Sequence, residues 1–196
     1  MQMSEWRRIH IIGGSGSGKS TLARAIASSR ALPVYDLDAI AYEQGAGIKR
    51  SLDARLADVR RIVGQPGWVT EGIFLWWTDE LLRAADVILW LDLPWRIGAR
   101  RVVIRHARAS IAGTNRHRGI MKLLRFLWAT QQYYGVKPPP TAPDDDRATS
   151  SAATGEALAA YADKVIRCRR PADIRDVMQA VVGRLQQEAG APWHIP

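Results

Sequence analysis

The chain has 196 residues, a single cysteine and a formal net charge of +9 that comes mostly from arginine. This length is enough to bury a core without covalent staples, and the lone Cys168 excludes both an intramolecular disulfide and a zinc site built from several thiols. The charge favours anionic partners, because arginine binds phosphate through two parallel hydrogen bonds, but it does not identify the anion.

Short apolar runs alternate with amphipathic stretches along the chain, a pattern typical of an α/β protein with a mostly parallel sheet. The expected strands cover Trp6 to Ile12, Pro33 to Leu37, Trp68 to Thr70, Asp86 to Pro94 and Lys164 to Cys168. The expected helices cover about Gly18 to Ser29, Ser51 to Val63, Trp95 to Ala109, Ile120 to Tyr134 and Ala172 to Glu188. Prolines, three successive aspartates and small polar residues predict a Pro/Asp-rich loop or partly disordered excursion over about 135–155.

A glycine-rich stretch lies between the first expected strand and helix. It reads "GGSGSGKS" and fits the P-loop pattern G-x-x-x-x-G-K-[ST]. Glycines allow consecutive backbone N–H groups to turn toward a phosphate, and the adjoining helix N-terminus adds partial positive charge. Lys19 would reach the β- and γ-phosphates, and the Ser20 hydroxyl would bind Mg²⁺. The residues expected to bind ATP are Gly13, Gly14, Ser15, Gly16, Ser17, Gly18, Lys19, Ser20 and Thr21. The alternative is a glycine-rich turn with a surface lysine.

Other nucleotide-binding classes fit these residues less well. A dinucleotide fold needs G-x-G-x-x-G, but the position of its third glycine is taken by Lys19. Guanine recognition of the Ras type needs Asn-Lys-x-Asp, whereas the only asparagine of the chain, Asn115, stands in "TNRHR". The sequence therefore favours adenine-nucleotide phosphoryl chemistry.

Acidic residues follow three of the expected strands. Asp36 and Asp38 fall on the same side of an extended chain, so one could hold an acceptor hydroxyl or act as its base while the other could reach metal-bound water. The alternative is a pair of solvated acids or a helix cap. Glu71 and Asp92 both end strands and compete for the role of the acid that orients Mg²⁺ through water. The choice between them depends on strand order.

Arginines dominate the helix expected after Pro94. Arg101, Arg105 and Arg108 share one helix face, and Arg116 and Arg118 follow, so that about 101–119 forms a lid-like region. Such a face could close over ATP and stabilise charge on the transferred phosphoryl group. The alternative is a solvated helix face.

Four motif runs together resemble one known family. "IIGGSGSGKSTLARAIA", "LPVYDLDAI", "GWVTEGIF" and "ADVILWLDLPWRIGARRVVIR" are similar to runs of the adenylate-kinase-like P-loop proteins known as DNA topology modulation proteins, over roughly residues 7 to 134. The resemblance implies a nucleoside-monophosphate-kinase-like, three-layer fold with helices on both faces of a five-stranded parallel sheet of order 2-3-1-4-5. That order would place the strand of Glu71 beside the P-loop strand, and so favours Glu71 over Asp92 as the acid that orients Mg²⁺. The resemblance also matches Asp38 to an aspartate of that family, and Arg101 and Arg105 to two of its arginines.

The leading hypothesis is an ATP- and Mg²⁺-dependent kinase that transfers the γ-phosphoryl group to a small-molecule acceptor such as a nucleotide or nucleoside. Lys19, Asp38, Arg101 and Arg105 would be catalytic, and Ser20 and Glu71 would hold the metal. We expect one P-loop kinase-like domain over residues 1–190, a cytoplasmic monomer or homodimer without membrane attachment.

Two alternatives remain open. A lapsed kinase would bind ATP without an acceptor. A regulatory ATP-binding protein would instead act on nucleic acid through basic and aromatic side chains. This hypothesis is not favoured, because the aromatic residues are also explained as the buried face of an amphipathic helix. The side chains in question are Arg116, Arg118, Lys122, Arg125, Phe126, Trp128, Tyr133 and Tyr134.

Overall fold

Five parallel strands form the centre of the protein. The computed structural model describes residues 6–43, 47–113, 119–135, 137–142 and 144–183, and its sheet has the order β2-β3-β1-β4-β5. The strands are β1 (Arg8–Gly13), β2 (Val34–Asp36), β3 (Trp68–Gly72), β4 (Val87–Leu91) and β5 (Val165–Cys168). The expected order 2-3-1-4-5 is thereby confirmed. It places β3 directly beside β1, with Glu71 opposite Ile11.

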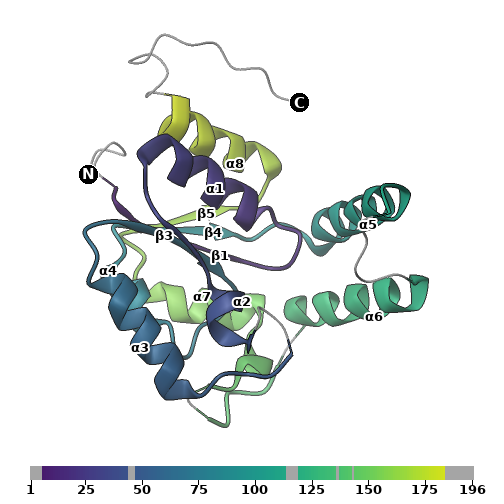
Figure 1. Ribbon diagram of the computed structural model, residues 1–196, viewed down its shortest axis with the longest axis horizontal. Helices are drawn as coiled ribbons and strands as arrows, with labels where there is room; N and C mark the ends of the chain where they lie inside the picture. The colour runs from purple at the N-terminus through teal and green to yellow at the C-terminus, as the bar shows by residue number, and fades with distance from the viewer. Residues whose placement is uncertain (1–5, 44–46, 114–118, 136, 143, 184–196) are drawn as a thin grey trace.

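Helices cover both faces of this sheet, which confirms the expected three layers (Figure 1). On one face lie α1 (Lys19–Arg30) and α8 (Pro171–Met178), which continues as a π-helical turn over Gln179–Gly183. On the other lie α2 (Leu37–Ala41), α3 (Leu52–Val63), α4 (Asp79–Ala84) and α7 (Ser151–Ala159). Two further helices, α5 (Trp95–Ile111) and α6 (Ile120–Gln131), lie side by side as an arm beyond the sheet (Figure 1).

The central strands are apolar because both of their faces are covered. Ile9 and Ile11 of β1 pack into the cluster that includes Leu22 of α1. Ile12 of the same strand belongs to the opposite cluster, together with Ile62 of α3. Alternate side chains of a strand point to opposite faces, so a strand between two helix layers needs apolar residues at nearly every position.

The structure differs from the sequence-based expectation in the segment 135–155. This segment was expected to be a loop, but a 3₁₀ turn forms at Asp146–Ala148 and α7 begins at Ser151. The Ser150 hydroxyl caps this helix by accepting a hydrogen bond from the backbone N–H of Ala153 at 3.1 Å. The loop prediction was therefore wrong from residue 151 onward.

The second expected strand is also shorter than predicted. It ends at Asp36 because Leu37 already belongs to α2, a helix of five residues that was not expected. The carboxylate of Asp36 accepts a hydrogen bond from the backbone N–H of Asp38 at 2.8 Å and thus caps α2. The alternative interpretation of this acid pair, in which an acid caps a helix, is therefore correct for Asp36. The last helix was expected to end near Glu188, which lies outside the described residues.

Candidate active site

The glycine-rich loop joins the end of β1 to the start of α1. Gly16 and Gly18 have φ angles of 75° and 104°, a left-handed conformation that glycine adopts without steric cost. The ammonium group of Lys19 donates a hydrogen bond to the carbonyl oxygen of Gly14 at 3.2 Å, so the lysine folds back over its own loop. The residues predicted to cradle a phosphate therefore form a compact loop at a helix N-terminus, which is the geometry that anion binding requires.

The first turns of α5 pack closely against this loop. A Cβ added to Gly16 would lie 2.5 Å from the carbonyl oxygen of Gly98, and one added to Gly98 would lie 2.6 Å from that of Ser15. The guanidinium of Arg101 donates a hydrogen bond to the carbonyl oxygen of Ser17 at 2.7 Å. Two glycines thus allow α5 to approach the loop, and Arg101 fixes the contact. Gly98 was not among the predicted site residues; a glycine within an otherwise helical pattern was the available signal.

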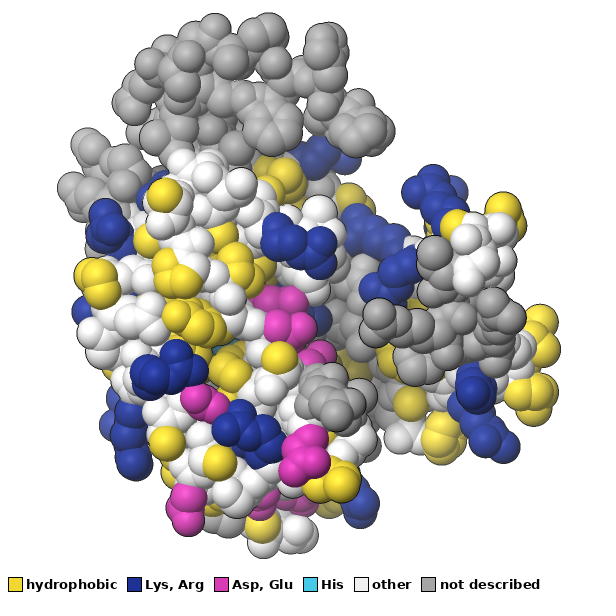
Figure 2. Space-filling model, viewed as in Figure 1, with side chains coloured by type: hydrophobic (Ala, Val, Ile, Leu, Met, Phe, Trp, Pro, Cys, Tyr) yellow, Lys and Arg dark blue, Asp and Glu magenta, His cyan; other side chains and the backbone are white. Residues whose placement is uncertain are grey.

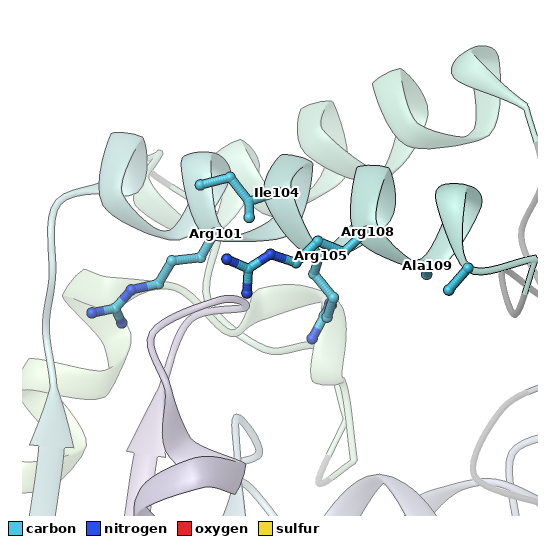
Figure 3. A pocket seen from close by; sticks show the side chains of 6 residues that line it. Arg101, Ile104, Arg105, Arg108 and Ala109 are labelled. Carbon is cyan, nitrogen blue, oxygen red and sulfur yellow. The ribbon is translucent and has the colours of Figure 1, made fainter. Parts of the chain in front are cut away.

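The predicted arginine face is directed at the loop. The side chains of Arg101, Arg105 and Arg108 extend from α5 toward the P-loop and line an open cavity of about 520 Å³ together with Ile104 (Figure 3). Arg101 and Arg105 also line a second cavity of about 390 Å³. The other residues around it are Gly16, Gly18, Lys19, Ser20, Thr21, Arg24 and Val102. The prediction that the three arginines share one helix face is confirmed. Arg116 and Arg118 lie outside the described residues.

The charges of three carboxylates act on the ammonium group of Lys19. Burial lowers the pKa of Lys19, while the negative charges of Glu71, Asp38 and Asp36 oppose this effect. Loss of hydration and the charge of Asp36 raise the pKa of Asp38, and Lys19 acts in the opposite direction. The candidate acids are therefore near enough to Lys19 for their charges to act on it. On the face shown in Figure 2, acidic side chains lie among Lys and Arg side chains on the part of the molecule built around the sheet, and the arm of α5 and α6 shows Lys and Arg side chains without acidic ones.

The two candidates for the metal-orienting acid have different surroundings. Asp92 accepts hydrogen bonds from Arg167 at 2.6 Å and from the Ser151 hydroxyl at 2.9 Å. Glu71 is 5% exposed on β3, beside the P-loop strand, and its carboxylate has no hydrogen-bond or ion-pair partner within the described part of the chain. The carboxylate of Asp92 is thus already bound by side chains of the protein, whereas the carboxylate of Glu71 is available to orient a metal ion.

The loop and its surroundings fit a nucleotide phosphate and its metal. A cavity of about 390 Å³ is bounded by the loop, Ser20 and two arginines of α5. A hydroxyl oxygen at Ser20 and a carboxylate at Glu71 are the hard oxygen donors that Mg²⁺ prefers. The donor set therefore suits ATP with Mg²⁺.

The aromatic residues near the end of the arm fall into two groups. Tyr133 is buried and Tyr134 is half-buried, as expected for residues that face the core. Phe126 and Trp128 on α6 are instead 42% and 66% exposed. The favoured interpretation of these aromatics as one buried helix face is therefore correct at Tyr133 and wrong at Phe126 and Trp128. Among the described residues, no helix is long and apolar enough to cross a membrane.

Solved structures of kinases share this architecture. The shikimate kinase from Acinetobacter baumannii, solved in complex with shikimate, matches with 17% identity, a TM-score of 0.51 and coverage of 96% of each chain. A gluconokinase from Sinorhizobium meliloti 1021 matches with 18% identity and a TM-score of 0.46, covering 97% of this chain and 96% of its own. No protein-family model and no curated protein matches the chain. The chain therefore has the fold of P-loop kinases.

Proposed function

We propose that the protein is an ATP-dependent phosphotransferase acting on a hydroxyl group of a small molecule. The observation that carries this proposal is the combination of three elements: Lys19 lies in the phosphate-binding loop, the charge of Asp38 on α2 acts on Lys19, and Arg101 of α5 donates a hydrogen bond to the carbonyl oxygen of Ser17. Phosphoryl transfer needs these three parts, since catalysis of this reaction is mostly positioning and charge stabilisation. A glycine turn without catalytic purpose would need none of them.

Each residue then has a distinct role. Lys19 neutralises charge on the β- and γ-phosphates, and Arg101 and Arg105 stabilise the transferred group. Ser20 and Glu71 would hold Mg²⁺, which would offset phosphate charge. The acceptor oxygen forms a bond to the γ-phosphorus while the bond from that phosphorus to the β–γ bridging oxygen breaks. ADP leaves with the electron pair, and the hydroxyl proton passes to the carboxylate of Asp38.

The test is transfer from labelled ATP to a panel of hydroxyl compounds by the parent and by Lys19→Ala. The variant should lose about a hundredfold or more in transfer rate, because the phosphate charge loses its partner, while its thermal unfolding stays cooperative. Lys122→Ala, an exposed lysine on α6, is the matched control and should transfer like the parent. Equal transfer by parent and Lys19→Ala would refute the assignment of the loop.

A second candidate is a regulatory ATP-binding protein that acts on nucleic acid, without small-molecule kinase activity. The exposure of Trp128 and Phe126, with Lys122 and Arg125 on the same helix, favours it, because bases stack on exposed aromatic rings beside basic groups. Its prediction is single-stranded DNA affinity that falls steeply with salt and is lost in Trp128→Ala. Negligible DNA binding at low salt would remove this candidate.

The motif runs around the P-loop, Asp38 and Glu71 support a narrower proposal as well. On these runs we propose that the chain is one of the adenylate-kinase-like proteins of the DNA topology modulation group, and we propose that it is a cytoplasmic monomer or homodimer. The name of that group is not evidence of DNA binding. Gel filtration coupled to light scattering would distinguish the two oligomeric states.

A further inference from the structure

The net positive charge of the protein is concentrated in the segment that contains the arm. Residues 93–143, which include α5 and α6, contain ten Lys and Arg residues and no Asp or Glu. The net charge of the whole chain is +9, so the rest of the chain, which forms the body around the sheet, is close to neutral. Three arginines of α5 face the P-loop. The kinase function proposed above uses none of the basic residues of α6.

One side of α6 packs against α5. Leu123, Leu127 and Thr130 recur at helical spacing and are half-buried. The hydroxyl oxygen of Thr130 accepts a hydrogen bond from the indole N–H of Trp95 on α5 at 3.4 Å. This row of residues therefore forms the inner side of α6.

A second apolar row lies on another side of the same helix and is exposed. Ile120, Leu124 and Trp128 follow one another at intervals of four residues, and Met121 lies beside them. Ile120 is 70% exposed and Leu124 is 52% exposed. These four residues are called the outer face of α6 below. Large apolar side chains that share an exposed face mark a surface for binding a partner. On the face shown in Figure 2, hydrophobic side chains lie next to basic ones at the outer edge of the arm.

Basic residues border the outer face. Lys122 and Arg125 are both exposed, and a helix with about 3.6 residues per turn places Arg125 next to Met121. A helix that has Trp and aliphatic residues on one face and Lys or Arg on the adjoining face is typical of helices that lie in the headgroup region of a bilayer. Anionic headgroups attract the basic residues, and the apolar side chains enter the boundary with the acyl chains.

Two other partners fit this face less well. Single-stranded nucleic acid would stack on Trp128, but the aliphatic side chains of Ile120, Met121 and Leu124 offer no ring on which a base could stack. A second copy of the chain bound through the same face would bring two arms of like charge together, and like charges repel. The combination of aliphatic exposure and positive charge therefore favours a lipid surface.

We propose that the outer face of α6 binds the surface of an anionic phospholipid membrane. Ile120, Met121, Leu124 and Trp128 insert among the headgroups, while Lys122 and Arg125 pair with lipid phosphates. The arginines at the P-loop belong to α5 and line cavities there. Membrane binding through α6 therefore does not depend on the proposed kinase function, and either can fail without the other.

The experiment measures sedimentation of the full chain with vesicles of phosphatidylcholine alone and of phosphatidylcholine mixed with phosphatidylglycerol. At about 0.1 M salt we expect binding to the anionic vesicles that is about tenfold or more stronger than binding to phosphatidylcholine alone. Leu124→Gln should weaken binding to the anionic vesicles by about tenfold, because a leucine side chain no longer leaves water. Lys122→Gln should weaken it by about fivefold, as expected for one basic residue near the surface.

Ile48→Gln is the matched control, since Ile48 lies on the body and is as exposed as Ile120, at 70%. This control should bind vesicles like the parent. Thermal unfolding and ATP titration should be unchanged in all three variants. Equal binding by the parent and Leu124→Gln, or no binding of the parent to anionic vesicles, would overturn the inference. Binding to single-stranded DNA that Leu124→Gln retains, without binding to vesicles, would overturn it in favour of nucleic acid. Self-association that Leu124→Gln abolishes, again without binding to vesicles, would overturn it in favour of a second copy.

Discussion

The charge of Asp36 acts on the ionisation of its neighbour Asp38. Loss of hydration and the charge of Asp36 both raise the pKa of Asp38. Only the ionised carboxylate can accept the proton of the acceptor, so transfer should rise with pH through a pKa above the ordinary aspartate value of about 3.9. Asp36→Asn removes one negative charge and should shift this acidic limb of the profile to lower pH. Asparagine still caps α2 at the N–H of Asp38.

The measurement is kcat against pH for the parent, Asp36→Asn and Asp38→Asn. Asp38→Asn should lower kcat by about a hundredfold or more and lose the acidic limb. Asp53→Asn, an exposed acid in the first turn of α3, is the control and should keep the parental profile. If Asp36→Asn left the limb at the same pH, the proposed base would not be Asp38.

At this scale, contiguous sites could be predicted from sequence and dispersed ones could not. The loop from Gly13 to Ser20 has fixed spacing, so its chemistry is visible in eight letters of sequence. The pair of Arg55 and Asp144 joins residues 89 positions apart, and neither has a local pattern that names its partner. Pairing of this kind depends on how α3 and the segment before α7 come together in the fold.

The contact between α5 and the P-loop gives a prediction at the scale of elements. Gly98→Ala would place a methyl group 2.6 Å from the carbonyl oxygen of Ser15, so α5 must move away from the loop and carry Arg101 with it. Alanine is the better helix former, so the substitution would stabilise an isolated helix. In this protein we expect ATP affinity to fall by about tenfold or more, since small displacements of charged groups in a site are costly.

Calorimetric titration with ATP measures this loss. Gly64→Ala is the matched control, because Gly64 ends α3 with an ordinary helical backbone and an added Cβ would lie 3.4 Å from its nearest neighbour, the carbonyl oxygen of Arg60. The control should bind ATP as the parent does. Parental ATP affinity in Gly98→Ala would show that the packing of α5 on the loop does not position the arginines.

The elements that sequence failed to predict are short or lack a hydrophobic pattern. The helix α2 has five residues and α4 has six, so neither completes two turns over which apolar residues could recur. The helix α7 has the sequence "SAATGEALA", in which most residues are small, so its buried face has no clear hydrophobic pattern. It also follows a Pro/Asp-rich segment. The hydroxyl cap at Ser150 was the available signal for its start.

Over the whole molecule, the alternation of apolar runs and amphipathic stretches was sufficient to predict an α/β fold. Strands buried on both faces must be nearly all apolar, so β4 with its run "VILWL" was the clearest element in the sequence. The order of the strands has no such signature and was implied only by the family resemblance. The arm of α5 and α6 was predicted as two helices, but the exposure of α6 depends on how the arm leaves the body (Figure 1).

A histidine in the middle of the sheet makes the stability of the whole molecule depend on pH. His10 on β1 is fully buried, and its Nδ1 lies 2.8 Å from the hydroxyl oxygen of Thr70 on β3. Burial lowers the pKa of His10 from 6.5 to about 4. As the pH falls below 6.5, His10 becomes protonated in the unfolded chain, whereas in the folded protein it stays neutral until about pH 4.

Stability from this group is therefore complete above pH 6.5 and is lost progressively between pH 6.5 and about 4. The full loss is about 3 kcal/mol, from the difference between the folded and unfolded pKa values. Urea unfolding of the parent and of His10→Gln at about pH 7 and about pH 4.5 measures it. Glutamine cannot titrate and retains a partner for Thr70, so the variant should lose less stability on acidification than the parent by most of this amount. An equal loss in both proteins would assign the acid sensitivity to other groups.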